Sequence, residues 1–191
     1  MRTFIAIEMS AEIKAGMKEL QDKLRTSGAD VAWTRPDGVH LTLKFLGEVD
    51  AATVESFGAA LEEAVKGTSP FTLDVRGTGV FPTPKAPRVV WLGLEGGLDA
   101  LAMLYEKVEA VCEGLGFKRE GRPFKPHVTL GRVKSLRGRE SLMKALAGFE
   151  KVELGVIKAD AVSVMKSELR PSGAVYTEMH RIELKSEDEL K

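Results

Sequence analysis

Apolar and polar side chains alternate in two short stretches that share one pattern. The first stretch, His40–Leu43, is His-Leu-Thr-Leu, and the second, His127–Leu130, is His-Val-Thr-Leu. Alternation with a period of two is typical of a β-strand, because successive side chains point to opposite faces. Each stretch therefore predicts a strand that buries one face and presents a histidine and a threonine on the other. Continued alternation predicts Lys44 on the histidine face and Phe45 on the buried face.

Alternation and helical spacing predict further strands and helices in the first half of the chain. The first elements are a strand at 4–7, a helix that is capped by Ser10 and ends at residues 27–29, and a short strand at 31–33. A turn at 35–38 leads into the first histidine strand, which ends at Gly47. A helix capped by Asp50 and a strand at 71–75 follow. Residues 77–87 are rich in glycine and proline and predict a loop.

From residue 89 the same order of elements begins again. It comprises a strand at 89–94, a helix at 101–111 followed by glycines 114 and 116, a loop, the second histidine strand, a helix at about 141–149, and a strand at 152–156. Residues 161–165 continue as extended chain, with a shift of phase that indicates a β-bulge. A hairpin turn at 170–173 and a last strand at 174–184 follow, and the charged residues 185–191 are predicted to fray.

The order strand, helix, histidine strand, helix, strand therefore occurs twice. We interpret residues 1–191 as a single domain built by internal duplication, with halves at about 1–80 and 88–184. The predicted class is α+β, with each half forming a mostly antiparallel sheet that carries helices on its outside. If a pseudo-two-fold axis relates the halves, the two histidine strands face a common groove.

The charge is balanced over the whole chain but concentrated locally. Lys and Arg together number 28, as do Asp and Glu, so the formal net charge is zero and a general polyanion binder is not expected. A basic segment nevertheless surrounds the second motif, which favours local phosphate binding. Its cations are Lys118, Arg119, Arg122, Lys125, Arg132, Lys134, Arg137 and Arg139.

The single cysteine and the lengths of the apolar runs indicate the cell compartment and exclude some chemistry. Cys112 is the single cysteine, so an intramolecular disulfide is excluded, and its apolar helical surroundings predict a core position. The first residues lack the apolar core of a signal peptide, and no apolar run reaches membrane-spanning length. We therefore expect a cytoplasmic enzyme or binding protein without a membrane association or an obligate protein partner.

The paired motifs resemble those of the 2H phosphoesterase superfamily, which is named for two such histidine motifs. Residues 2–7, 40–47, 87–93 and 124–130 look like the RNA 2′,3′-cyclic phosphodiesterase branch, also called 2′-5′ RNA ligase-like. The resemblance implies a bilobal fold with both motifs in a central cleft. It also implies hydrolysis of an RNA terminal 2′,3′-cyclic phosphate to a 2′-phosphomonoester, without metal or nucleotide cofactor. The substrate would be RNA with such an end, tRNA fragments being one candidate.

Opening a cyclic phosphodiester requires a base for water and an acid for the departing alcohol. Histidine, with an ordinary pKa of about 6.5, can serve as either near neutral pH. The resemblance assigns His127 as the proton acceptor and His40 as the proton donor, whereas the residues alone do not choose between them. Thr42 and Thr129 are expected to donate hydrogen bonds to the phosphate oxygens.

Other candidates have weaker support from the sequence. Arg132 and Lys44 are candidate substrate-binding cations, although strict alternation places Arg132 on the face away from His127. Three aromatic residues could stack on a base or fill the core, namely Trp33, Phe124 and Tyr176. His180 lacks a following threonine and is expected to be structural or exposed. A metal site would need a third ligand beside the two motif histidines, and no typical spacing offers one.

Two other functions remain open from the sequence. The same histidines could join a cyclic-phosphate end to a 5′-hydroxyl through a 2′-5′ link, which is the reverse type of reaction. The cleft could also belong to a non-catalytic module that binds RNA or a nucleotide. A small cyclic nucleotide remains open as the substrate, although the basic segment favours a polynucleotide. The presence of His and Thr at all four motif positions favours catalysis over binding alone.

Overall fold

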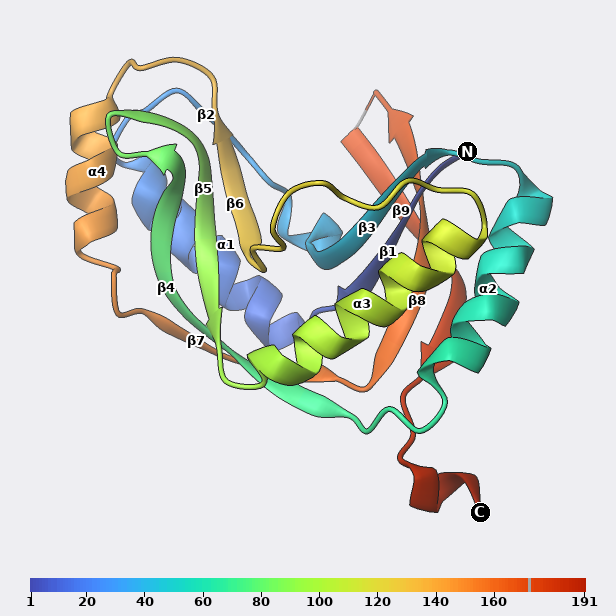
Figure 1. Ribbon diagram of the computed structural model, residues 1–191. Coiled ribbons are helices and arrows are strands. Elements are labelled where there is room, and N and C mark those ends of the chain that lie inside the picture. The colour runs from blue at the N-terminus through green and yellow to red at the C-terminus, as the bar shows by residue number, and fades with distance from the viewer. Residues whose placement is uncertain (172) are drawn as a thin grey trace.

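The computed structural model describes residues 1–171 and 173–191, and it contains two antiparallel sheets flanked by helices (Figure 1). The first sheet has the strand order β3-β1-β8-β9, with bounds His40–Glu48, Arg2–Glu8, Ala161–Arg170 and Gly173–Glu183. The second has the order β2-β6-β5-β4-β7, with bounds Val31–Trp33, Val128–Val133, Ala86–Glu95, Phe71–Thr83 and Glu153–Ala159. The predicted α+β class with two antiparallel sheets is confirmed.

Four α-helices in the described part of the chain accompany the sheets. They are α1 (Ala11–Arg25), α2 (Ala51–Val65), α3 (Leu98–Gly114) and α4 (Arg139–Ala147). Both predicted caps are present, because the Ser10 hydroxyl accepts from the Ile13 amide and the Asp50 carboxylate accepts from the Thr53 amide. None of these helices is long and apolar enough to cross a bilayer.

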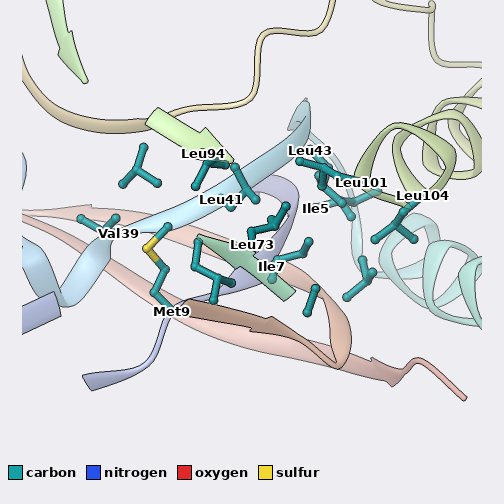
Figure 2. Close-up of a cluster of buried hydrophobic side chains, with 14 of the residues drawn as sticks. Ile5, Ile7, Met9, Val39, Leu41, Leu43, Leu73, Leu94, Leu101 and Leu104 are labelled. Carbon is teal, nitrogen blue, oxygen red and sulfur yellow. The ribbon is translucent and has the colours of Figure 1, made fainter. Parts of the chain in front are cut away.

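The main core lies on the faces of the sheets that meet the helices. On β1 and β3, the core residues Ile5, Ile7, Leu41 and Leu43 are almost fully buried, and Figure 2 shows them packed with Leu73 of β4. Burying one such side chain contributes roughly 1.5–3 kcal/mol. A smaller apolar cluster of Phe4, Ala6 and Met165 lies apart from this core, with the half-buried Tyr176 packed on it. The first sheet is therefore apolar on both faces.

The two halves of the sequence exchange strands, which corrects the expectation that each half forms its own sheet. Strands β2 and β4 come from the first half but belong to the second sheet. Strands β8 and β9 come from the second half and complete the first sheet, where β8 pairs with β1. The physical reason is local for β4, because it pairs with β5 across a tight turn and therefore joins the sheet of β5.

The loop predicted at residues 77–87 is wrong, because this segment belongs to the long β4–β5 hairpin. Pairing runs from Asp74 with Glu95 to Thr83 with Ala86. Gly79 is needed there for packing, since a Cβ on it would lie 2.2 Å from the Trp91 ring. The glycine thus makes room for an aromatic side chain on the neighbouring strand and does not end the strand.

The C-terminal residues form one short element. Ser186 precedes a 3₁₀ helix at Glu187–Leu190, and the Glu189 carboxylate accepts hydrogen bonds from the Ser186 amide and hydroxyl. Fraying of residues 185–191 stays a prediction. The predicted bulge is confirmed as a register shift at Val164 and Met165. The predicted hairpin turn includes residue 172, which lies outside the described residues, and β8 and β9 pair on either side of it.

Candidate active site

The first histidine motif contains a β-bulge at its fourth residue. Thr42 pairs with Ala6 of β1, whereas Lys44 pairs with Ile5, so Leu43 is an extra residue in β3. An extra residue reverses the facing of every side chain beyond it. Lys44 is therefore turned to the buried face and is only 8% exposed, whereas the Phe45 side chain is 73% exposed.

These two positions correct the facing that strict alternation predicted. Lys44 was expected beside His40 and Thr42, and Phe45 was expected in the core. The Lys44 amino group instead forms an ion pair of 2.8 Å with Glu109 of α3 and donates a 2.8 Å hydrogen bond to the Lys118 carbonyl. Direct substrate contact by Lys44 stays a prediction. Its amino group contacts Glu109 and Lys118.

The second motif contains the same irregularity at the same place. Thr129 of β6 pairs with Trp91 of β5 and Gly131 pairs with Val90, which leaves Leu130 as the extra residue. Beyond it, Arg132 is exposed and lies on the same face as Thr129. Strict alternation placed Arg132 on the face away from His127. The bulge instead turns Arg132 to the face of Thr129.

One cleft of about 1210 Å³ brings the predicted residues together. Its wall includes the histidine and threonine of both motifs, and Arg132 also lines it. The first motif reaches it from β3 of the first sheet, and the second from β6 of the second sheet. The six predicted site residues on its wall are His40, Thr42, Lys44, His127, Thr129 and Arg132.

Both motif histidines are oriented by a carbonyl two residues earlier. The Nδ1 atom of His40 lies 3.0 Å from the Gly38 oxygen, and that of His127 lies 2.7 Å from the Lys125 oxygen. A carbonyl can only accept, so each Nδ1 carries a hydrogen and donates it. Each Nε2 is consequently the atom that can take up or release a proton.

Aromatic rings contact both imidazoles edge to face. His40 lies 5.5 Å from Phe4 and 5.2 Å from Tyr176, measured between ring centroids. His127 lies 5.1 Å from Phe81 of β4 at an interplanar angle of 87°. These contacts restrict ring rotation and, with the carbonyl hydrogen bonds, hold each imidazole in one orientation.

Burial has the largest effect on the pKa of His40, and neighbouring groups shift this pKa in both directions. Burial lowers its pKa from the ordinary value, and the positive charge of Lys14 acts in the same direction. The Gly38 hydrogen bond opposes this shift, as do the carboxylates of Glu8 and Glu178. The Glu8 carboxylate is 3.8 Å from Nε2, the atom that exchanges the proton. Burial therefore favours the neutral form of His40, and an added negative charge beside it favours the protonated form.

The segment between α3 and β6, residues 115–127, leads directly into the second motif and runs past β3 in Figure 1. Buried contacts tie this segment to α3 and β3. The Glu109 carboxylate is 2% exposed and accepts from the Glu120 amide, while Lys44 holds the Lys118 carbonyl. One ion pair thus connects the strand of the first motif to the chain that carries the second.

The comparison with known proteins agrees with this geometry. Residues 7–91 and 92–176 match the sequence model of the family described as LigT like Phosphoesterase. The chain belongs to the LigT-like phosphoesterase family. The resemblance that the two motifs indicated is therefore confirmed.

Two curated relatives of this LigT-like phosphoesterase are each named RNA 2′,3′-cyclic phosphodiesterase. The protein from Methanothermobacter thermautotrophicus is 34% identical over 178 residues, which cover 93% of this chain and 96% of that protein. The protein from Thermotoga maritima is 36% identical over 176 residues, which cover 92% and 91%.

Solved structures share the fold. The protein TT0787 of Thermus thermophilus superimposes with a TM-score of 0.80 at 31% identity, covering 98% of this chain and all of that one. Escherichia coli LigT, solved in complex with 3′-AMP, gives a TM-score of 0.77 at 24% identity, covering 97% and 98%. At this lower identity, the second likeness shows the fold alone.

The three aromatic candidates for base stacking in this LigT-like phosphoesterase lie either in the cleft or against the core. Tyr176 and Phe124 line the cleft, where Phe124 stacks on Tyr105 with 4.0 Å between ring centroids. Trp33 packs against the main core.

His180 and Cys112 lie outside the two histidine motifs. His180 faces away from the cleft and contacts the Glu55 carboxylate at 3.2 Å. Cys112 is fully buried, and burial raises the pKa of its thiol to about 11, as expected of a core residue. In the described residues, no three His, Cys, Asp or Glu side chains are grouped to hold a metal ion.

Sequence reasoning missed two contacts of the motif histidines. The predicted loop at residues 77–87 includes Phe81, whose ring contacts His127. The predicted first strand ends at residue 7 and leaves out Glu8, which β1 pairs with His40. An available signal was the alternation of β1, where Phe4 and Glu8 are both even-numbered and share a face.

Proposed function

We propose that this protein hydrolyses the terminal 2′,3′-cyclic phosphate of RNA to a 2′-phosphomonoester by acid and base catalysis with two histidines. The supporting observation is that both motif histidines line one cleft, each with Nδ1 bound to a carbonyl and Nε2 left for proton transfer. The names of the curated relatives support the same reaction.

In the proposed reaction, His127 Nε2 removes a proton from water, and the water oxygen forms a bond to phosphorus. The bond between phosphorus and the ribose 3′-oxygen breaks, and that oxygen takes a proton from His40 Nε2. The product is a 2′-phosphomonoester with a free 3′-hydroxyl. A positioned acid or base typically contributes roughly 10²–10⁴-fold. The bound phosphate anion favours the protonated state of His40 and so opposes the effect of burial on its pKa.

The remaining motif residues are proposed to stabilise the phosphate. Thr42 and Thr129 face the cleft from opposite strands, where their hydroxyls can donate to the non-bridging oxygens as charge develops on them. Arg132 lies two residues beyond the Leu130 bulge on the same face as Thr129, and its guanidinium matches the geometry of two phosphate oxygens.

Turnover of an oligoribonucleotide with a 2′,3′-cyclic phosphate end, without added metal, tests this function. Replacing either motif histidine by Gln should lower kcat at least 100-fold while the circular dichroism spectrum is retained. His180→Gln is the matched control, because this third histidine contacts Glu55 away from the cleft and should leave kcat unchanged. Full activity of His40→Gln or His127→Gln would overturn the proposal.

The same preparation distinguishes the alternatives. Adding an RNA with a 5′-hydroxyl end and assaying for a 2′-5′ linked product measures ligation beside hydrolysis. A binding module would retain RNA affinity in the double histidine variant and show no turnover in the native protein. No structural feature favours either alternative over hydrolysis.

We also propose the RNA substrates and the cell compartment of the reaction. The substrates would include tRNA fragments with cyclic ends, and the reaction would take place in the cytoplasm. Sequencing of cyclic-phosphate RNA ends in cells that lack the protein would test this, since its substrates should accumulate. We also propose that the single domain arose by internal duplication, which the equivalent bulges of the two motifs support.

A further inference from the structure

The cleft is charged unevenly along β1. Near His40, Glu8 and Glu178 contribute negative charge, and Lys14 contributes a positive charge. At the other end of β1, Arg2 is exposed and lines the cleft. Arg2 and Glu8 are the two ends of the strand, and Glu8 pairs with His40, so the Cα of Arg2 lies about 20 Å along β1 from the residue that pairs with His40. This distance is longer than one nucleotide.

Lys118 is tied through Lys44 to the middle of β1. Its carbonyl accepts from Lys44 at 2.8 Å, and Lys44 pairs with Ile5, which is the central residue of that strand. Its side chain is exposed and lines the cleft. Because the Lys44 contact is buried, the backbone of Lys118 is held in place and its ammonium projects from a fixed point.

The acidic residues near Arg2 and Lys118 are paired with other cations, which leaves these two side chains available to bind phosphate. Glu48, the cross-strand neighbour of Arg2, is paired with the N-terminal amine at 3.0 Å. Arg119, next to Lys118, is paired with two glutamates of α3. In residues 1–171 and 173–191, no ion pair involves Arg2 or Lys118. Among the described residues, the part of the cleft between the middle of β1 and Arg2 therefore carries two cations without a paired carboxylate.

We propose that Arg2 and Lys118 form a phosphate subsite for nucleotides upstream of the reacting group, so that the protein acts on oligonucleotides in preference to mononucleotides. The inference rests on the proposed hydrolysis. A cyclic phosphate occupies the 3′ end of RNA, so the chain leaves the motif histidines only in its 5′ direction. Arg2 and Lys118 attract the phosphates of that upstream chain along β1.

The experiment compares kcat/KM for 2′,3′-cyclic AMP with kcat/KM for a tetranucleotide that ends in the same cyclic group. The native protein should favour the tetranucleotide at least tenfold. In the Arg2→Ala/Lys118→Ala variant this ratio should fall close to one. The Lys151→Ala/Lys158→Ala variant is the matched control, because it removes two exposed positive charges outside the cleft and should keep the native ratio.

Salt dependence gives a second readout. The slope of log kcat/KM against log salt for the tetranucleotide should become shallower by about 1.4 in the Arg2→Ala/Lys118→Ala variant, or about 0.7 for each lost phosphate contact. An unchanged length ratio and slope, with cyclic AMP still hydrolysed, would overturn the subsite and leave the proposed function intact. Absence of turnover of both substrates by the native protein would instead overturn the hydrolysis, and the subsite with it.

Discussion

Phe45 and Arg132 occupy corresponding places in the two motifs. Each follows its motif histidine by five residues, and each reaches the cleft because the fourth motif residue forms a bulge. The side chains differ in chemistry, with an exposed ring on one side and a guanidinium on the other. The two-fold repetition of the backbone therefore supports a cleft that is chemically asymmetric, as a substrate with one phosphate at its end requires.

Arg132→Ala is expected to lower kcat/KM on the cyclic-phosphate oligonucleotide by about 10- to 100-fold, the loss typical of a hydrogen bond to a charged group. Arg132→Lys should recover only part of this, because an ammonium keeps the charge but lacks the planar fork. Arg25→Ala on α1, where the arginine pairs with Asp22 on the surface, is the control. Equal rates for Arg132→Ala and Arg25→Ala would contradict the assignment.

Thr42→Val and Thr129→Val are each expected to lower kcat by about 10²–10³-fold, because each removes one hydroxyl donor without changing the size of the side chain. Thr→Ser at the same positions retains the donor and should retain most of the activity. Steady-state kinetics should show the loss in kcat more than in KM. A loss confined to KM would indicate ground-state binding instead.

Glu8→Gln is expected to move the alkaline limb of the kcat/KM profile to lower pH. The proposed acid, His40, must carry its proton, so activity falls as the pH rises through its pKa. The Glu8 carboxylate raises that pKa, and its removal lets burial lower the pKa further. Glu62→Gln on the exposed face of α2 serves as the control. A shift to higher pH, or none, would show that Glu8 does not act on the catalytic proton.

Lys44→Met is expected to lower the free energy of unfolding by about 3–5 kcal/mol, because it leaves the buried Glu109 carboxylate without its cation. The double variant Lys44→Met/Glu109→Leu removes both charges and should be more stable than the single one. Urea unfolding measures both values. If the single substitution cost less than about 1 kcal/mol, the pair would be no anchor for residues 115–127.

The sequence was sufficient for the strands of both motifs, the two helix caps and the four motif residues, because period-two alternation and capping chemistry are local signals. It failed at Leu43 and Leu130, where one extra residue reverses the facing of Lys44 and Arg132. A bulge depends on pairing with a partner strand, and at these two positions we found no shift of phase like the one that indicated the bulge in residues 161–165. The exchange of β8 and β9 between the halves was likewise invisible, since strand partners are chosen in three dimensions.

The position of β8 also constrains how the protein is made. On a ribosome, β1 and β3 are synthesised early, but the edge of β1 that pairs with β8 has no partner until residues 161–170 are released. During translation His40 is therefore carried by an unfinished sheet. Competence for chemistry should thus arise only after residues 161–170 have been released, and translation products that stop before β8 should be inert although they contain both motifs.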